Sequence, residues 1–124
     1  MNKEQIVQAY LEYLEKGEME KVIQLFDKDG IVESPLYGEQ LADNFYKKLA
    51  ADTNASRLKF DGLFFEEGTD RVSLLFDYEW EMKNGKTVCF KVVDIIEFTK
   101  KIKIKKLTII YNTVEAKEIW DNLK

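Results

Sequence analysis

The sequence predicts an α+β fold, in which a cone-shaped, curved and mostly antiparallel sheet wraps over three N-terminal helices and a short helix follows at the C-terminus. Two observations lead to this prediction. Apolar residues recur at helical spacing in the first third of the chain, and beyond Asn54 they alternate with polar residues as in strands. Helices followed by a run of consecutive strands are typical of α+β domains. With 124 residues, the chain fits one domain spanning residues 1–124.

Three amphipathic segments predict the N-terminal helices. The first has an apolar face made of Ile6, Ala9, Tyr10, Tyr13 and Leu14, and Gly17 interrupts its pattern. The second is expected over residues 19–26, and the third over about residues 40–51. Between them, residues 27–30 predict a turn, and residues 31–34 predict a short strand that Pro35 ends.

Four longer strands are expected to build most of the sheet. They cover residues 58–65, 72–82, 88–98 and 104–111, and Gly62 indicates a bulge in the first of them. Asn84 and Gly85 predict a hairpin turn between the second and the third. Residues 114–123 carry apolar side chains on one side and predict the short C-terminal helix.

Composition excludes several classes of function. A net charge of −4 argues against nucleic acid as a partner, because phosphate binding needs a positive surface. No apolar run approaches the roughly 20 residues of a membrane-spanning helix, and the N-terminus lacks the apolar stretch of a signal peptide. A single cysteine, Cys89, cannot form an internal disulfide, so we expect a cytoplasmic location.

The absence of histidine restricts the chemistry further. It removes the commonest general base and the commonest metal ligand, and with one cysteine it excludes zinc sites and nucleophiles paired with histidine. We therefore expect no metal and no organic cofactor. Any catalysis would use carboxylates, tyrosines, lysines or water.

The order of the elements and three stretches of sequence resemble a known superfamily. The stretches are residues 7–22, residues 29–46 with Asp29-Gly30 and Phe45-Tyr46, and residues 92–98. Over residues 5–112 this order is similar to the nuclear transport factor two-like and ketosteroid isomerase-like superfamily, which includes SnoaL-like proteins. The resemblance implies the cone-shaped fold, one apolar pocket, and a homodimer formed through the outer face of the sheet.

The resemblance also implies roles for individual residues. Tyr10 matches the tyrosine that stabilises an enolate oxygen in steroid isomerases, Asp94 matches their neutral aspartic acid, and Tyr46 matches a supporting tyrosine. The position of the catalytic base, just before the proline, holds Ser34. A serine without a base beside it is too weak to remove a carbon-bound proton, so we do not expect steroid isomerisation.

Asp94 is the residue on which a functional interpretation depends. Its strand face carries apolar neighbours, including Val92 and Ile96, so an ionised carboxylate there would be costly unless it were paired. One hypothesis is a carboxyl with a raised pKa that hydrogen-bonds Tyr10 as part of a site. The other is a carboxyl that only satisfies a buried tyrosine or a backbone amide.

The walls of the pocket depend on the strand register at Asn84-Gly85. A two-residue turn would place Asp77 and Glu79 on the Asp94 face, whereas a three-residue turn with a bulge would place Tyr78 and Trp80 there. Burying three carboxylates without a cation is expensive, so the aromatic side chains are expected to face inward. The predicted ligand-binding residues are Ser34, Tyr46, Tyr78, Trp80, Phe90 and Tyr111, and the candidate catalytic residues are Asp94 and Tyr10.

Two functions from different classes remain open. The first is binding of a small apolar or carbonyl-containing molecule, with or without cofactor-free isomerase, cyclase or hydratase activity. The second is a non-catalytic dimerisation or protein-interaction module, with Val93 and Ile95 contributing an apolar outer face. An open cavity beside a buried Asp94 would favour the first, and a cavity filled by Trp80, Phe90 and Tyr111 the second. An epoxide-hydrolase-like site needs an arginine between two acids, which Arg57 and Arg71 are not expected to supply.

Overall fold

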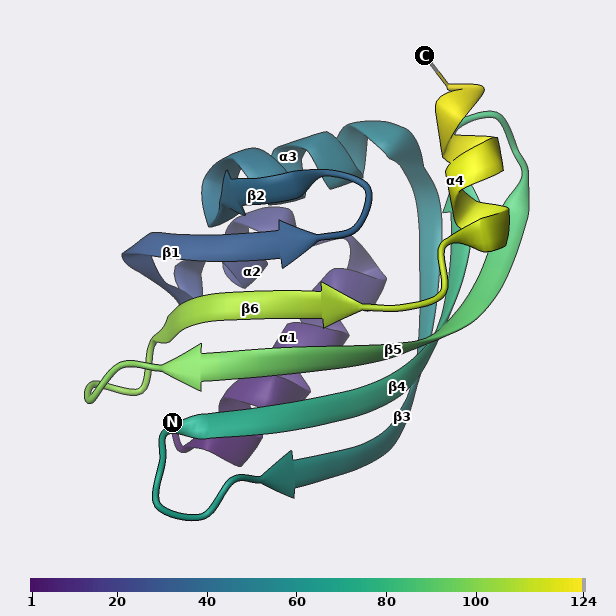
Figure 1. Cartoon of the computed structure of the whole chain (residues 1–124). Helices are drawn as coiled ribbons and strands as arrows, with labels where there is room; N and C mark the ends of the chain where they lie inside the picture. Colours follow the sequence, from purple (N-terminus) through teal and green to yellow (C-terminus); the bar gives the residue numbers. More distant parts are fainter. Residues whose placement is uncertain (124) are drawn as a thin grey trace.

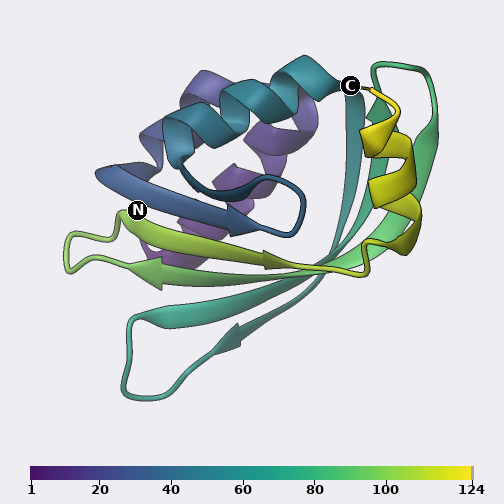
Figure 2. The same cartoon turned by 45° about the horizontal axis from the view of Figure 1, so that its top comes forward.

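The computed structural model describes residues 1–123 as an α+β fold with a curved, unclosed six-stranded sheet (Figures 1 and 2). The helices are α1 (Lys3–Lys16), α2 (Met19–Gln24), α3 (Ala42–Asp52) and α4 (Val114–Asp121). The strands are β1 (Phe26–Ser34), β2 (Gly38–Leu41), β3 (Thr53–Phe65), β4 (Arg71–Met82), β5 (Thr87–Phe98) and β6 (Ile104–Ile110). Their order in the sheet is β2-β1-β6-β5-β4-β3, with β1 and β6 parallel and the other neighbours antiparallel.

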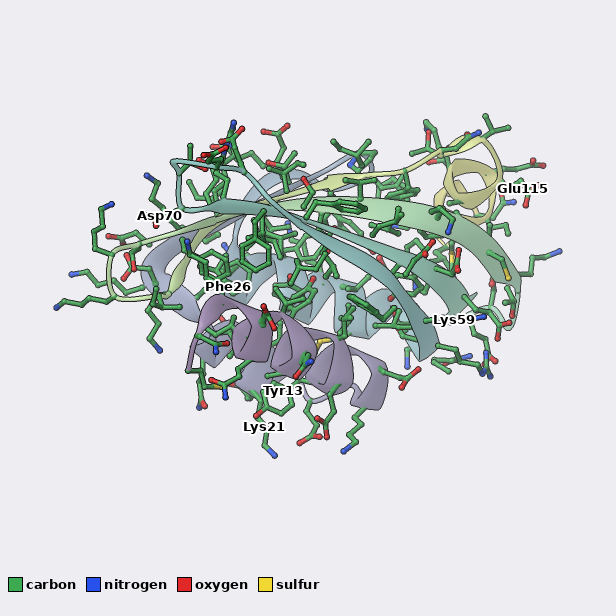
Figure 3. The ribbon with its side chains drawn as sticks, turned by 90° about the horizontal axis from the view of Figure 1, so that it is seen from below. Tyr13, Lys21, Phe26, Lys59, Asp70 and Glu115 are labelled. Carbon is green, nitrogen blue, oxygen red and sulfur yellow. The ribbon has the colours of Figure 1, made fainter. Side chains whose placement is uncertain are left out.

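The helices form one layer against the sheet. Figure 2 shows α1, α2 and α3 on one side of the sheet, while α4 stands at one end beside the far ends of β3, β4 and β5. Side chains fill the space between the layers, whereas Tyr13 and Lys21 point outward from the helices (Figure 3). Among residues 1–123, no helix combines the length and the hydropathy that crossing a bilayer requires.

Local sequence signals explain the ends of α1. The Asn2 side chain accepts a hydrogen bond from the Gln5 amide at 2.8 Å, and the Gln5 side chain accepts one from the Asn2 amide at 2.9 Å. This reciprocal pair satisfies two backbone donors that a helix start leaves open. Gly17 ends the helix in the left-handed conformation, at φ 72°, which glycine adopts without steric cost.

The region between α2 and α3 differs from the expectation. Residues 27–30, predicted as a turn, lie within β1, which begins at Phe26 rather than Ile31. The register against β6 steps from Phe26–Ile104 to Ile31–Lys106, so these residues form an irregularity in a continuing strand. Gly30 is required there, because a Cβ atom would lie 2.8 Å from the Phe26 ring.

The sequence prediction also missed one strand and misplaced one helix start in this region. Strand β2 was not anticipated, and α3 begins at Ala42 rather than near residue 40. Residues 38–41 pair with the end of β1, from Ser34–Gly38 to Ile31–Leu41. A four-residue strand at the edge of a sheet carries too little periodicity to be recognised in the sequence.

The register of the β4–β5 hairpin agrees with the expectation. Tyr78 lies opposite Phe90, and Trp80 lies opposite Val88. Because Met82 bonds Lys86 across the turn, three residues form the loop, and Gly85 occupies its left-handed position at φ 81°. The even-numbered side chains of β4 are therefore buried under the helices. The bulge expected at Gly62 is also present, between Phe60 and Gly62.

Candidate functional site

A cavity of about 40 Å³ lies between the inner face of the sheet and the helices. One water molecule needs roughly 10–15 Å³ on this scale, so the space holds about three. Seven of the eight predicted site residues line it: Tyr10, Ser34, Tyr78, Trp80, Phe90, Asp94 and Tyr111. The other lining residues are Leu14, Tyr37, Phe45, Leu49, Phe76, Val92 and Ile109. The cavity is narrow but not filled, so it is intermediate between the open pocket and the pocket filled by aromatic side chains that the sequence left as alternatives.

Asp94 projects into this cavity from the middle of β5. Its strand neighbours are Leu74 on β4 and Ile109 on β6, and only 1% of the residue is exposed. Among the described residues, neither carboxyl oxygen has a hydrogen-bond partner. Burial raises the pKa of Asp94 well above its usual value, which favours the neutral acid.

The raised pKa agrees with the first sequence-based hypothesis for Asp94, but the hydrogen-bond partners that both hypotheses gave it are wrong. Its carboxyl does not bond Tyr10, and it satisfies no other tyrosine or amide in residues 1–123. The Tyr10 hydroxyl instead shares a hydrogen bond of 2.7 Å with the Tyr46 hydroxyl. Because the two tyrosine hydroxyls satisfy each other, neither needs the Asp94 carboxyl as a hydrogen-bond partner.

Tyr46 supports Tyr10 from behind rather than lining the cavity. It is fully buried, and its ring contacts the rings of Phe26 and Phe45 at centroid distances of 5.7 and 4.8 Å. Burial raises the pKa of Tyr10 and of Tyr46, so both hydroxyls keep their protons. When Tyr46 donates to Tyr10, the Tyr10 proton is free to donate elsewhere.

Ser34, at the position where the family's base is expected, has no base beside it. Its hydroxyl accepts a hydrogen bond of 3.1 Å from the Tyr37 amide. Glu33 lies on the opposite face of β1, where it pairs with Lys106 at 3.5 Å, as strand alternation predicts. No residue on this strand therefore offers a carboxylate base to the cavity.

Stacked aromatic side chains form one wall. The Phe90 ring stacks on Tyr111 at 4.3 Å and on Tyr78 at 5.5 Å, with interplanar angles of 19° and 24°. The Tyr78 hydroxyl is bonded to Ser56 at 2.7 Å, and burial raises the pKa of Tyr78 to about 12. The Trp80 indole donates to Thr53 at 2.8 Å. Because these polar atoms are already paired, both residues offer mainly apolar surface.

Tyr37 is the polar lining residue that the sequence analysis missed. Its hydroxyl donates to the Asp52 carboxylate at 2.6 Å, and the Trp120 indole donates to the same carboxylate at 3.2 Å. The rings of Tyr37 and Trp120 meet edge to face at 5.3 Å. These contacts tie the β1–β2 turn, the end of α3 and α4 together, and no local pattern could signal them.

The remaining missed residues are apolar. Leu14, Phe45 and Leu49 were recognised as apolar faces of helices, but periodicity does not separate a cavity wall from solid core. Among residues 1–123, no lysine or arginine lines the cavity. Arg57 contacts Glu79 and Glu81, but all three lie on the exposed outer face of the sheet, so no arginine between acids is available inside. Within residues 1–123, no group of three or more potential metal-ligating side chains occurs.

The arrangement can bind and polarise an oxygen atom. A neutral carboxyl and a tyrosine hydroxyl are hydrogen-bond donors, and both lie in an apolar enclosure where such bonds are strong. The carboxyl of Asp94 is the one carboxyl among the described lining residues, and burial raises its pKa and so disfavours the ionised form that would act as a base. These residues include no histidine or lysine.

Comparisons with known proteins locate the fold. No protein-family profile matches the chain, and no curated protein matches it by sequence. The solved structures that resemble it include an NTF2-like protein of unknown function from Burkholderia pseudomallei, with a TM-score of 0.81 and 19% identity over 95% of this chain and 96% of that one.

Two further structures are similar at 14% identity. One has a ketosteroid isomerase-like fold, comes from Catenulispora acidiphila and is in complex with trimethylamine, with a TM-score of 0.75 over 86% of this chain and 85% of that one. The other is an epoxide hydrolase/cyclase-like enzyme of pyran ring formation in the polyether salinomycin, with a TM-score of 0.76 over 91% and 92%. The chain therefore has the fold of the NTF2-like and ketosteroid isomerase-like proteins, as the order of its sequence elements indicated.

Proposed function

We propose that this protein binds a small, largely apolar molecule in the cavity and holds a carbonyl oxygen of that molecule with Asp94 and Tyr10. The observation that carries the proposal is the carboxyl of Asp94, which is buried without any partner among the described residues. Buried polar groups in native proteins are nearly always hydrogen-bonded. An acid kept unpaired in an aromatic enclosure is explained by a ligand that pairs with it.

Any catalysis would follow from the same two donors. A carbonyl oxygen that accepts hydrogen bonds from Asp94 and Tyr10 becomes more electrophilic, which assists isomerisation, cyclisation or hydration without a cofactor. The similarity to an epoxide hydrolase/cyclase-like enzyme supports a reaction of this kind. Since the cavity measures about 40 Å³, a ligand much larger than three waters needs the stacked Phe90 and Tyr111 rings to move.

Binding of 2-cyclohexenone, a small apolar ketone, tests the proposal. We expect chemical-shift changes in amides around the cavity when the ketone is titrated into the wild-type protein. Asp94→Leu should abolish them, whereas Asp77→Leu, the same substitution on the outer face of the sheet, should leave them unchanged. Shifts that are absent in the wild type, or that persist in Asp94→Leu, would contradict a site built on Asp94.

A second proposal concerns the outer face of the sheet. Leu75, Val93 and Ile95 are half-buried there, and next to them Phe64 and Ile110 are 58% and 52% exposed. An apolar patch of this kind marks a protein interface, and a self-complementary patch forms a two-fold dimer. We infer that two copies associate through this face.

Sedimentation of a matched pair of variants tests the dimer. Val93→Glu places a charge in the centre of the patch and should convert a dimer into a monomer. Val114→Glu makes the same change at a residue of α4 that is 77% exposed, and it should leave the dimer intact. A wild-type protein that sediments as a monomer would refute the interface.

We also infer a cytoplasmic location. The single, exposed Cys89 supports it, because a chain with one cysteine has no internal disulfide that a reducing compartment would break.

A further inference from the structure

The hydrogen-bonding capacity of Asp94 is more specific than a single donor. A protonated carboxyl carries an O–H donor and a carbonyl acceptor on adjacent atoms. Both oxygens of Asp94 lack partners among residues 1–123, so the donor and the acceptor are available together. The neighbouring tyrosines do not use them, since Tyr10 is bonded to Tyr46 and Tyr78 to Ser56.

A simple ketone would use only half of this capacity. Its oxygen accepts one hydrogen bond from the acid, and the carbonyl oxygen of Asp94 remains buried without a donor. Leaving a buried acceptor unsatisfied costs free energy that a better-matched ligand avoids. A molecule with its own donor and acceptor side by side forms two parallel hydrogen bonds with the carboxyl and satisfies both oxygens.

Charge and shape narrow the ligand class further. The described residues that line the cavity include no cation, so a carboxylate or phosphate ligand would be buried without a counter-charge from them. A carboxylate also lacks the donor that the acid's carbonyl oxygen needs. The rings of Tyr78, Phe90 and Tyr111 stack on one another and make one side of the cavity aromatic and apolar. Because the cavity measures only about 40 Å³, a flat molecule fits beside them better than a bulky one.

We propose that the cavity selects planar, uncharged molecules that carry a donor and an acceptor on adjacent atoms, as a ring lactam does, and that the Asp94 carboxyl pairs with both. This inference rests on the proposed function, because it assumes that the cavity takes a ligand. It goes further in stating which hydrogen-bonding pattern the ligand presents.

Two pyridones of nearly the same shape provide the test. 2-Pyridone has an N–H next to its carbonyl, and N-methyl-2-pyridone has the same ring and carbonyl without the donor. We expect 2-pyridone to bind the wild-type protein about tenfold more tightly in calorimetric or NMR titrations, as one additional buried hydrogen bond implies.

Two variants separate hydrogen bonding from the bulk of the methyl group. Asp94→Asn keeps a donor and an acceptor on adjacent atoms and should keep the preference for 2-pyridone. Asp94→Leu has neither group, and the preference should disappear. Circular dichroism confirms that each variant is folded, and if the leucine variant is unfolded or binds neither pyridone, the smaller Asp94→Ala variant, which also lacks both groups, takes its place.

Each remaining outcome overturns the inference in a recognisable way. Equal binding of the two pyridones, or binding of 2-cyclohexenone alone, would refute the donor–acceptor pattern and leave the proposed cavity function standing. A preference that persists in Asp94→Leu would assign it to the methyl group. If neither pyridone nor 2-cyclohexenone binds, the proposed function fails together with the inference.

Discussion

Replacing Asp94 by leucine should stabilise the unliganded protein, although most substitutions at buried positions destabilise. The wild-type carboxyl is buried and neither of its oxygens has a hydrogen-bond partner in residues 1–123, and a buried polar group that lacks a partner costs about 1–3 kcal/mol. Leucine removes this cost, and the adjoining cavity of about 40 Å³ gives its larger side chain room. For a chain of this length, each kcal/mol gained raises Tm by about 3–5 °C.

The pH dependence of this gain follows from the raised pKa of Asp94. The folded state holds the proton more tightly than the unfolded state, whose aspartate titrates near pH 3.9. With respect to this group, the wild-type protein is therefore most stable below that pH, and it loses stability as the pH rises toward the folded-state pKa. Tyr10, Tyr46 and Tyr78 stay protonated, since burial raises the pKa of each. The advantage of the leucine variant should therefore grow by about 1.4 kcal/mol per pH unit above pH 4, up to the folded-state pKa.

Urea unfolding followed by tryptophan fluorescence measures both effects, because Trp80 is buried beside the site. Asp94→Leu and the wild type are compared between pH 4 and pH 7. Ser56→Val serves as the control, since it removes a buried hydroxyl that does have a partner, Tyr78, and should destabilise the protein. A leucine variant less stable than the wild type, or a difference that does not change with pH, would refute the reasoning.

Three other predictions concern the surroundings of the site. Tyr46→Phe removes the partner of the buried Tyr10 hydroxyl and should lower the free energy of unfolding in urea by about 1–2 kcal/mol. The control Tyr13→Phe, at a half-buried position, should change it by less than about 0.5 kcal/mol, and equal effects would contradict the tyrosine pair. Gly85→Ala forces a Cβ into the left-handed region and should lower stability by about 1–2 kcal/mol, and an unchanged Tm would refute the proposed turn geometry. Trp120→Phe removes the indole donor that binds the α3 carboxylate, so amide hydrogen exchange should accelerate in α4 but not in β4 or β5; unchanged exchange would show that other contacts hold α4.

The sequence by itself determined the features that repeat along the chain. Helical spacing located α1 and α3, and alternation located β4 and β5 and placed Asp94 on their buried face. The cost of burying several carboxylates selected the three-residue turn at Gly85, and with it the inward direction of Tyr78 and Trp80. These conclusions hold because periodicity and burial cost act on neighbouring residues.

Only the tertiary structure decided the contacts between distant segments. Residues 27–30 continue β1 because β6 is available to pair with it, although their local signal is that of a turn. Tyr37 reaches the cavity because Asp52 and Trp120, on other elements, hold it there. Above all, Tyr10 meets Tyr46 across 36 residues of sequence and leaves Asp94 without a partner in the part of the chain that the structure describes. A hydrogen bond forms or fails within a few tenths of an ångström, and that distance is set by the packing of α1, α3 and β5 together.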